Sequence, residues 1–250
     1  MKRFYTLFMP LTLITFTTMS PATIQPRSIH YLLTEQTTPN LINILPAPPK
    51  ETDAAFAADK DAYKLGYSHK DSKRWETARL DSLLDYKDIT DVIPLTKRFN
   101  TAFGTTISPK TTPYTYRIIQ EIVRDQHLFT TPVKKHYQRQ RPFVRYHHST
   151  CNSIDEPYLI TNGSFPSGHT TLGWATALAL TEINPKRSVE ILQRGYDYGE
   201  SRIICGAHWQ SDVQAGRLAG SIMIARLNAE PTFRDWVTAA QKEIATNVTG

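Results

Sequence analysis

The chain has little cysteine and, after its first 22 residues, no long apolar run. Its 250 residues include two cysteines, Cys151 and Cys205, and these stand too far apart in the sequence for the paired-cysteine motif of a structural zinc site. About 20 consecutive apolar residues are needed to span a bilayer, and no segment after residue 22 supplies them. These absences argue against a zinc-stabilised fold and against an integral membrane protein.

Long runs of one charge and sustained apolar-polar alternation are missing as well. The chain carries 29 Lys and Arg against 23 Asp and Glu, a net charge of +6 without a basic cluster. Nucleic-acid binding is therefore not required, and a modest positive excess suits an anionic substrate as well as simple solubility. The lack of alternation with a period of two argues against half-buried strands.

The first 22 residues have the pattern of a secretory signal peptide. Lys2 and Arg3 provide a charged start, Phe4 to Phe16 is mostly apolar, and Ser20-Pro21-Ala22 offers small residues for cleavage. An uncleaved membrane anchor is the alternative, but Pro10 and several threonines interrupt the apolar run. We therefore expect cleavage near Ala22 and no membrane association afterwards.

The two cysteines fit an exported protein. An even pair in an oxidising compartment favours a disulfide. Closing the long loop between Cys151 and Cys205 would stabilise the fold by up to about 4 kcal/mol. Two buried free thiols are the alternative that the sequence leaves open.

Composition changes near residue 50. Residues 23–50 are rich in Thr, Pro and Asn and end in Leu45-Pro46-Ala47-Pro48-Pro49, which predicts an extended arm along the domain surface, with a disordered tail as the alternative. Helical spacing of apolar residues dominates from residue 51 to 250. The sequence predicts an all-α protein with a single helical domain, in which helices cover residues 53–65, 73–86, 116–129, 172–180, 186–201 and about 208–230.

Three short strings carry the residues suited to phosphate chemistry. They combine cations, histidines, a carboxylate and a Ser-Gly turn: Lys134 with Arg141-Pro142, then Pro166-Ser167-Gly168-His169, then Ser201-Arg202 with His208 and Asp212. Arginine donates in a planar fork to phosphate and lysine acts as a point charge. Any one of these cations taken alone is typical of a solvated surface.

The second string stands between a turn-rich loop and the apolar run from Leu172 to Leu180. It thus predicts a loop that leads into a helix N-terminus, where free N–H groups and the helix dipole favour an anion. Gly168 would let the backbone approach a phosphate oxygen, and Ser167 could add its hydroxyl. An ordinary helix start with Ser167 as the cap is the simpler interpretation.

His208 and Asp212 are four residues apart, which places them on one face of a helix. Asp212 could then accept a hydrogen bond from one ring nitrogen of His208 and leave the other free to attack phosphorus. A pair at this spacing is also common on protein surfaces, so the prediction depends on the other two strings.

Taken together, the strings Lys-x6-Arg-Pro, Pro-Ser-Gly-His and Ser-Arg-x5-His-x3-Asp resemble the signature of the type-2 phosphatidic acid phosphatase superfamily. Every element is present, and the intervening segments, residues 143–165 and 170–200, also resemble those of that superfamily. The chain also resembles the bacterial class A non-specific acid phosphatases, near the periplasmic acid phosphatase and apyrase branch. This resemblance is carried by Arg141-Pro142-Phe143, by the segment from Cys205 to Asp212 and by the Pro-rich arm.

The resemblance implies a compact helix bundle with the active site at one end, working in the periplasm without metal or cofactor. It implies His208 as the nucleophile that forms a phosphohistidine, Asp212 as its orienting group and His169 as the acid for the leaving alkoxide. Phosphate would be bound by a further set of residues: Lys134, Arg141, Ser167, Gly168 and Arg202. Because His208 must be neutral and the acid protonated, we expect activity to peak on the acidic side of neutrality.

Other functions share these strings. The main alternative is an apyrase-like hydrolase of nucleoside tri- and diphosphates. A vanadium-dependent haloperoxidase with His208 as vanadate ligand is less favoured. A non-enzymatic phosphate-binding protein would not need His208 and Asp212. We expect small phosphate esters as partners and neither nucleic acid nor membrane. By analogy with the family, a homo-oligomer is compatible with this chain.

Overall fold

Helices and their connections make up the part of the chain that the structure describes. The computed structural model describes residues 32–84 and 91–247, and no strand occurs in these ranges. The predicted signal peptide, residues 1–22, lies outside them. The described residues belong to one unit, residues 31–250, and they confirm the prediction of an all-α fold.

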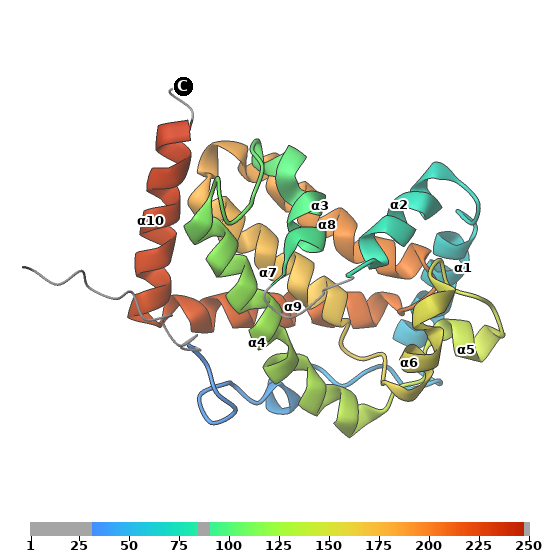
Figure 1. The fold of residues 1–250 in the computed structure, drawn as a ribbon. Helices are drawn as coiled ribbons and strands as arrows, with labels where there is room; N and C mark the ends of the chain where they lie inside the picture. Colours follow the sequence, from blue (N-terminus) through green and yellow to red (C-terminus); the bar gives the residue numbers. More distant parts are fainter. Residues whose placement is uncertain (1–31, 85–90, 248–250) are drawn as a thin grey trace, which may run out of the picture. The chain divides into compact units, whose positions relative to one another are not determined.

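The elements follow one another along the chain with short connections (Figure 1). The α-helices are α1 (Ala54–Tyr67), α2 (Lys73–Ser82), α3 (Ile93–Phe103), α4 (Pro113–Tyr137), α5 (Pro142–Tyr146), α6 (Glu156–Thr161), α7 (Gly168–Ile183), α8 (Ser188–Ile204), α9 (Gln210–Asn228) and α10 (Pro231–Asn247). Short 3-10 helices are η1 (Leu41–Asn43), η2 (Ser153–Asp155) and η3 (Pro185–Arg187).

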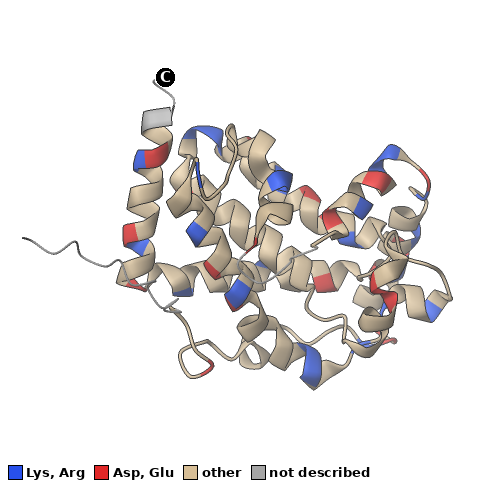
Figure 2. Cartoon of the chain, viewed as in Figure 1, with Lys and Arg blue, Asp and Glu red and all other residues tan. Residues whose placement is uncertain are grey.

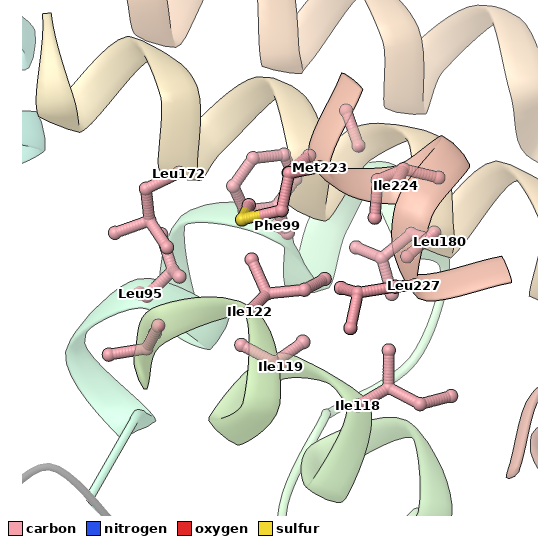
Figure 3. Close-up of a cluster of buried hydrophobic side chains, with 14 of the residues drawn as sticks. Leu95, Phe99, Ile118, Ile119, Ile122, Leu172, Leu180, Met223, Ile224 and Leu227 are labelled. Carbon is pink, nitrogen blue, oxygen red and sulfur yellow. The ribbon is translucent and has the colours of Figure 1, made fainter. Parts of the chain in front are cut away.

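Helix α7 is the centre of the unit because it is apolar on nearly all sides and packs against both α8 and α9. Small residues allow the close approach: a Cβ added to Gly173 would overlap the ring of Tyr198 on α8. Apolar side chains from α3, α4, α7 and α9 meet in the main core, where Phe99, Ile122 and Met223 are fully buried (Figure 3). The apolar periodicity seen in the sequence therefore builds the frame that supports the site.

Helix α4 is longer than predicted. The sequence indicated a helix over residues 116–129, whereas α4 runs from Pro113 to Tyr137 and passes through Pro132. Pro132 is exposed, and the helix continues past it although a proline lacks the N–H that would complete the helical hydrogen bond. The extension places Lys134 on the last turn of the helix.

Helix α2 is shorter than predicted. It ends at Ser82 and not at residue 86, because Leu83 adopts an extended backbone with ψ 103°. The carbonyl of Ser82, released by this end, accepts a hydrogen bond from Nε2 of His169 at 3.2 Å. Helix α8 also begins slightly later than expected, at Ser188, after the 3-10 turn η3.

The described part of the predicted arm, residues 32–50, is anchored in the core. Leu33, Leu41 and Leu45 are buried in the main apolar cluster, and η1 lies against α4. Asn40 caps η1 by accepting from the N–H of Ile42, so the segment is not extended throughout.

Charged residues are distributed without a large area of one sign. Basic and acidic residues are interspersed over the ribbon in the view of Figure 2. Within residues 32–84 and 91–247, no helix is both long and apolar enough to cross a membrane.

Cys151 and Cys205 form a disulfide, as predicted, with Cα atoms 4.7 Å apart. Alongside the covalent bond, the N–H of Cys151 donates to the carbonyl of Cys205 at 3.0 Å. The bridge joins the loop before η2 to the C-cap of α8, three residues before His208.

Candidate active site

Backbone contacts bring the three strings together. The N–H of Ser164 donates to the carbonyl of Arg139 at 2.9 Å, which ties the loop before α7 to the loop after α4. The N–H of Ser167 donates to the carbonyl of Asp212 at 3.0 Å, which ties the start of α7 to the start of α9. A Cβ added to Gly216 would lie 2.8 Å from the carbonyl oxygen of Ser167, so only glycine permits this approach.

Lys134 is buried with its ammonium group turned to the loop before α7. Nζ donates to the carbonyl of Gly163 at 2.7 Å and contacts that of Ser164 at 3.4 Å. Gly163 fits against α4 only without a side chain, since an added Cβ would lie 2.7 Å from the carbonyl oxygen of Lys134. Burial, followed by the charge of Arg141, holds the pKa of Lys134 well below its usual value.

Arg141, the N-cap residue of α5, is also buried. Its Nε donates to the carbonyl of Leu159 at 2.9 Å, and its Nη1 donates to that of Ala207 at 3.0 Å. Nη1 also lies 2.9 Å from Nε2 of His208. Burial lowers the pKa of Arg141 to about 10, so the guanidinium remains charged at neutral pH.

Arg202 on α8 is the cation with the fewest partners. It is 1% exposed, and its Nε and Nη1 have no hydrogen-bond partner within the described ranges. Burial lowers the pKa of this guanidinium, and the charge of Arg202 in turn lowers the pKa of both His169 and His208. A buried cation with free donors is stabilised by an anion.

His208 lies between Arg141 and Asp212. Because an arginine can only donate, Nε2 of His208 must accept from Arg141, and the ring proton is on Nδ1. Nδ1 faces Oδ2 of Asp212 at 3.4 Å. Burial, then Arg141, Lys134 and Arg202, holds the pKa of His208 well below its usual value, so the imidazole is neutral with Nε2 unprotonated.

The contact between His208 and Asp212 arises differently from the prediction. The two residues do not share a helix face, because α9 begins at Gln210, with Trp209 as its N-cap residue. Asp212 instead stands in the first turn of α9, where Oδ2 accepts from the N–H of Trp209 at 2.9 Å. Helix capping therefore turns the carboxylate back toward His208.

His169, in the first turn of α7, is oriented by the end of α2. The carbonyl of Ser82 can only accept, so the proton of the neutral ring is on Nε2, and Nδ1 is the nitrogen that a second proton would occupy. Burial, then the charge of Arg202, holds the pKa of His169 well below its usual value. Protonation of His169 is thus favoured only under acidic conditions or beside an anion.

Ser167 is the N-cap residue of α7. Its Oγ accepts from the N–H of Thr170 at 3.3 Å and from the Thr170 hydroxyl at 2.9 Å, which leaves the hydroxyl proton of Ser167 for another acceptor. Gly168 begins the helix beside Gln126, whose amide nitrogen would lie 3.0 Å from an added Cβ. Capping and anion binding are compatible here.

A cavity of about 290 Å³ joins these groups. Residues of all three strings line it, namely Lys134, Arg141, Gly168, His169 and His208, and its remaining wall includes Leu84, His127, Tyr158 and Leu159. A larger cavity of about 620 Å³ between residues 35–42 and α4 shares only His127 and Thr131 with it and contains no residue of the strings.

The sequence analysis missed Arg139, which binds Asp212 from the side opposite His208. Its Nη1 donates to Oδ1 of Asp212 at 2.5 Å, and its Nη2 donates to Oδ2 of Asp59 on α1 at 2.7 Å. The position of Arg139 two residues before Arg141 was visible, but nothing local in the sequence connects it with Asp59. No group of three or more His, Cys, Asp or Glu residues in the described ranges is arranged to hold a metal ion.

This all-helical fold places three buried cations near a neutral histidine that is backed by a carboxylate, an arrangement suited to binding an anion such as phosphate. The chain belongs to the PAP2 superfamily, whose pattern matches residues 118–233. It is 39% identical to the non-specific acid phosphatase of Salmonella typhimurium over 97% of this chain and 92% of that protein. It is 38% identical to the non-specific acid phosphatase of Providencia stuartii, over 87% and 85%, and 36% identical to the acid phosphatase of Zymomonas mobilis, over 80% and 74%.

Proposed function

We propose that this protein is an acid phosphatase that hydrolyses phosphate monoesters through a phosphohistidine on His208. The observation that carries the proposal is the set of buried cations around His208, among which Arg202 has guanidinium nitrogens without partners. A bound phosphate dianion would neutralise most of the excess charge of Lys134, Arg141 and Arg202. The likeness to acid phosphatases over nearly the whole chain supports the same function.

In the first step, Nε2 of His208 attacks phosphorus while the bond to the leaving oxygen breaks. Nε2 carries no proton, so none has to be removed, and the imidazolium that develops is stabilised by Asp212 at Nδ1. Arg141, which holds Nε2 in the substrate-free protein, would transfer its donor to a phosphate oxygen. His169, protonated at Nδ1, would give that proton to the leaving alkoxide.

In the second step, water attacks phosphorus from the side that the leaving group has left. His169, now neutral, would take a proton from this water at Nδ1, and the bond between Nε2 and phosphorus would break. Inorganic phosphate then leaves, and His208 returns to its initial tautomer. Lys134, Arg141 and Arg202 stabilise the equatorial oxygens in both steps because their positions do not change.

Phosphate release from a chromogenic monoester tests the proposal, measured under mildly acidic conditions with excess chelator and with or without orthovanadate. We expect turnover that survives the chelator, is blocked by vanadate and is lost in His208→Ala. His136→Ala is the matched control, since His136 is an exposed histidine on α4 close to Lys134 in the sequence. Quenching in an alkaline denaturant, in which a phosphohistidine survives, should trap phosphate on the wild-type protein and not on His208→Ala; no trapped phosphate with normal turnover would contradict the covalent step.

The same assay separates the remaining alternatives. Rates with ATP, ADP, AMP and phenyl phosphate distinguish a monoesterase from an apyrase-like hydrolase, because an apyrase would act on the di- and triphosphates and not on AMP. Halide oxidation after addition of vanadate, with no phosphate release, would favour the haloperoxidase.

We further propose that the protein works in the periplasm after removal of residues 1–22. The Cys151–Cys205 disulfide supports an oxidising compartment. Release by osmotic shock, with a new N-terminus near Thr23 by mass spectrometry, is the expected result. Retention of the full-length chain in the membrane fraction would contradict it.

A further inference from the structure

Arg139 joins two buried carboxylates that are far apart in the sequence. Its guanidinium donates to Oδ1 of Asp212 at 2.5 Å and to Oδ2 of Asp59 at 2.7 Å. The side chains of Arg139, Asp59 and Asp212 are 9%, 2% and 0% exposed. Ion pairs in such surroundings are much less screened than surface pairs, and loss of one partner leaves an uncompensated buried charge.

Ser211 closes this arrangement into a network. Its Oγ accepts from Nη1 of Arg139 at 2.7 Å and donates to Oδ2 of Asp59 at 2.6 Å, while its N–H donates to Oδ1 of Asp59 at 2.7 Å. The guanidinium also lies over the rings of Phe56 and Trp209, 5.9 and 5.7 Å from their centroids. Arg139 is therefore held in one position by groups from α1 and from the start of α9.

The network fixes the carboxylate that faces the nucleophile. Oδ1 of Asp212 is bound by Arg139, and Oδ2 accepts from the N–H of Trp209 and faces Nδ1 of His208. Rotation of the carboxylate would break both sets of contacts. The orientation of His208 therefore depends on Arg139 through Asp212.

We propose that Arg139, held by Asp59, is a positioning residue that orients Asp212 and sets the charge beside His208. The inference deepens the proposed phosphatase function and rests on it. The guanidinium of Arg139 is occupied by Asp212, Asp59 and Ser211, so Arg139 acts through Asp212 and not by binding phosphate itself. In metal sites, removal of a residue that orients a ligand without touching the metal commonly lowers activity by about 10- to 100-fold, and we expect the same range here.

Removal of the charge of Arg139 should be visible in the pH profile. The charged or titratable groups around His208 come from α4, the N-cap of α5, α7, α8 and α9: Lys134, Arg141, His169, Arg202 and Asp212. Without Arg139, the negative charge of Asp212 is less compensated and attracts a proton to His208 more strongly. The pKa of His208 then rises, and the acidic limb of kcat/KM, where His208 becomes protonated, moves to higher pH.

The test compares Arg139→Gln, Arg139→Lys and Asp59→Asn with Arg145→Gln. Arg145 is the matched control because it pairs with Glu51 and lies over the same Phe56 ring, but does not contact Asp212. We expect Arg139→Gln to lower kcat by about 10- to 100-fold with KM changed less than about threefold, and to move the acidic limb upward. Arg139→Lys should recover part of the loss, Asp59→Asn should act in the same direction, and Arg145→Gln should leave kcat and the pH profile unchanged.

A double-mutant cycle with Asp212→Asn separates positioning from general destabilisation. If Arg139 acts through Asp212, Arg139→Gln should change kcat only slightly once Asp212 has been replaced. An equal effect of Arg139→Gln on kcat in both backgrounds would overturn the inference. So would an unchanged acidic limb of the pH profile in a folded Arg139→Gln protein. In either case, turnover by the wild type would still support the phosphatase function. Should Arg139→Gln not fold, Arg139→Lys and Asp59→Asn give the same comparison; absence of wild-type turnover would instead reject the proposed function.

Discussion

Nη1 of Arg141 lies 2.9 Å from Nε2 of His208, the atom expected to attack phosphorus. The guanidinium both fixes the tautomer of the nucleophile and covers it until an anion arrives. A phosphate oxygen is a better acceptor for the charged donor than a neutral imidazole, so substrate binding should free Nε2. The residue that we propose to bind phosphate would thus also prepare the proposed nucleophile.

Arg141→Lys should lower kcat/KM strongly although charge is retained. Lysine cannot reproduce the planar fork that reaches the carbonyls of Leu159 and Ala207 together with His208. Loss of one preorganised donor in the transition state costs about 10²- to 10³-fold. Steady-state kinetics on a chromogenic monoester check this, with Arg145→Lys as the control; a loss below about tenfold would show that charge alone is sufficient.

The pH dependence follows from the lowered pKa values of the two histidines. His208 stays neutral well below its usual pKa because it is buried beside cations, whereas His169, whose pKa is lowered by burial and by Arg202, gains its acid proton only as pH falls. We therefore expect kcat/KM to rise as pH is lowered from about 8 toward 6. His136→Ala should show the same profile as wild type, and a maximum above about pH 8 would contradict the assigned acid role.

Gly216→Ala should damage the site through the backbone. The added Cβ would lie 2.8 Å from the carbonyl oxygen of Ser167 and 2.9 Å from Cβ of Thr170, so α9 must move away from the start of α7. Overpacking of this kind typically costs about 1–3 kcal/mol in the free energy of unfolding.

Denaturant unfolding and vanadate inhibition of the same variant check both effects. Vanadate should bind more weakly, because the turn that we propose to bind phosphate is displaced. Gln214→Ala, an exposed change on the same helix, should leave stability and inhibition as in wild type. An unchanged free energy of unfolding for Gly216→Ala would mean that α7 and α9 can move apart without loss of stability.

The disulfide should contribute to stability more than to catalysis. Cys151 and Cys205 are 54 residues apart in sequence, and a loop of that length suggests a contribution of up to about 4 kcal/mol. The double variant Cys151→Ser with Cys205→Ser should lower the midpoint of thermal unfolding while retaining turnover at low temperature. An equal midpoint for this variant and the oxidised wild type would show that the covalent bond adds nothing to the remaining contacts.

Much of the site was readable in the sequence because its signals are local. A serine before a glycine and an apolar run predicts a capped helix start, and Ser167 is the N-cap residue of α7. The pairing of Cys151 with Cys205 followed from there being two cysteines in a chain with an export pattern. The contact of His208 with Asp212 was also predicted, although for a different reason: Asp212 folds back as part of a helix cap.

Other features depended on residues that are distant along the chain. The end of α2 at Ser82 matters because its carbonyl meets His169, 87 residues away. Asp59 reaches Arg139 across 80 residues, and no local pattern distinguishes either from a solvated surface charge. The sequence by itself indicated the all-α fold, several of its helices, the disulfide pair and the three strings proposed to bind phosphate, since each depends on neighbours in the chain or on residue counts. Only the tertiary structure decided which buried charges meet, because ion pairs form where packed helices bring their side chains within hydrogen-bonding distance.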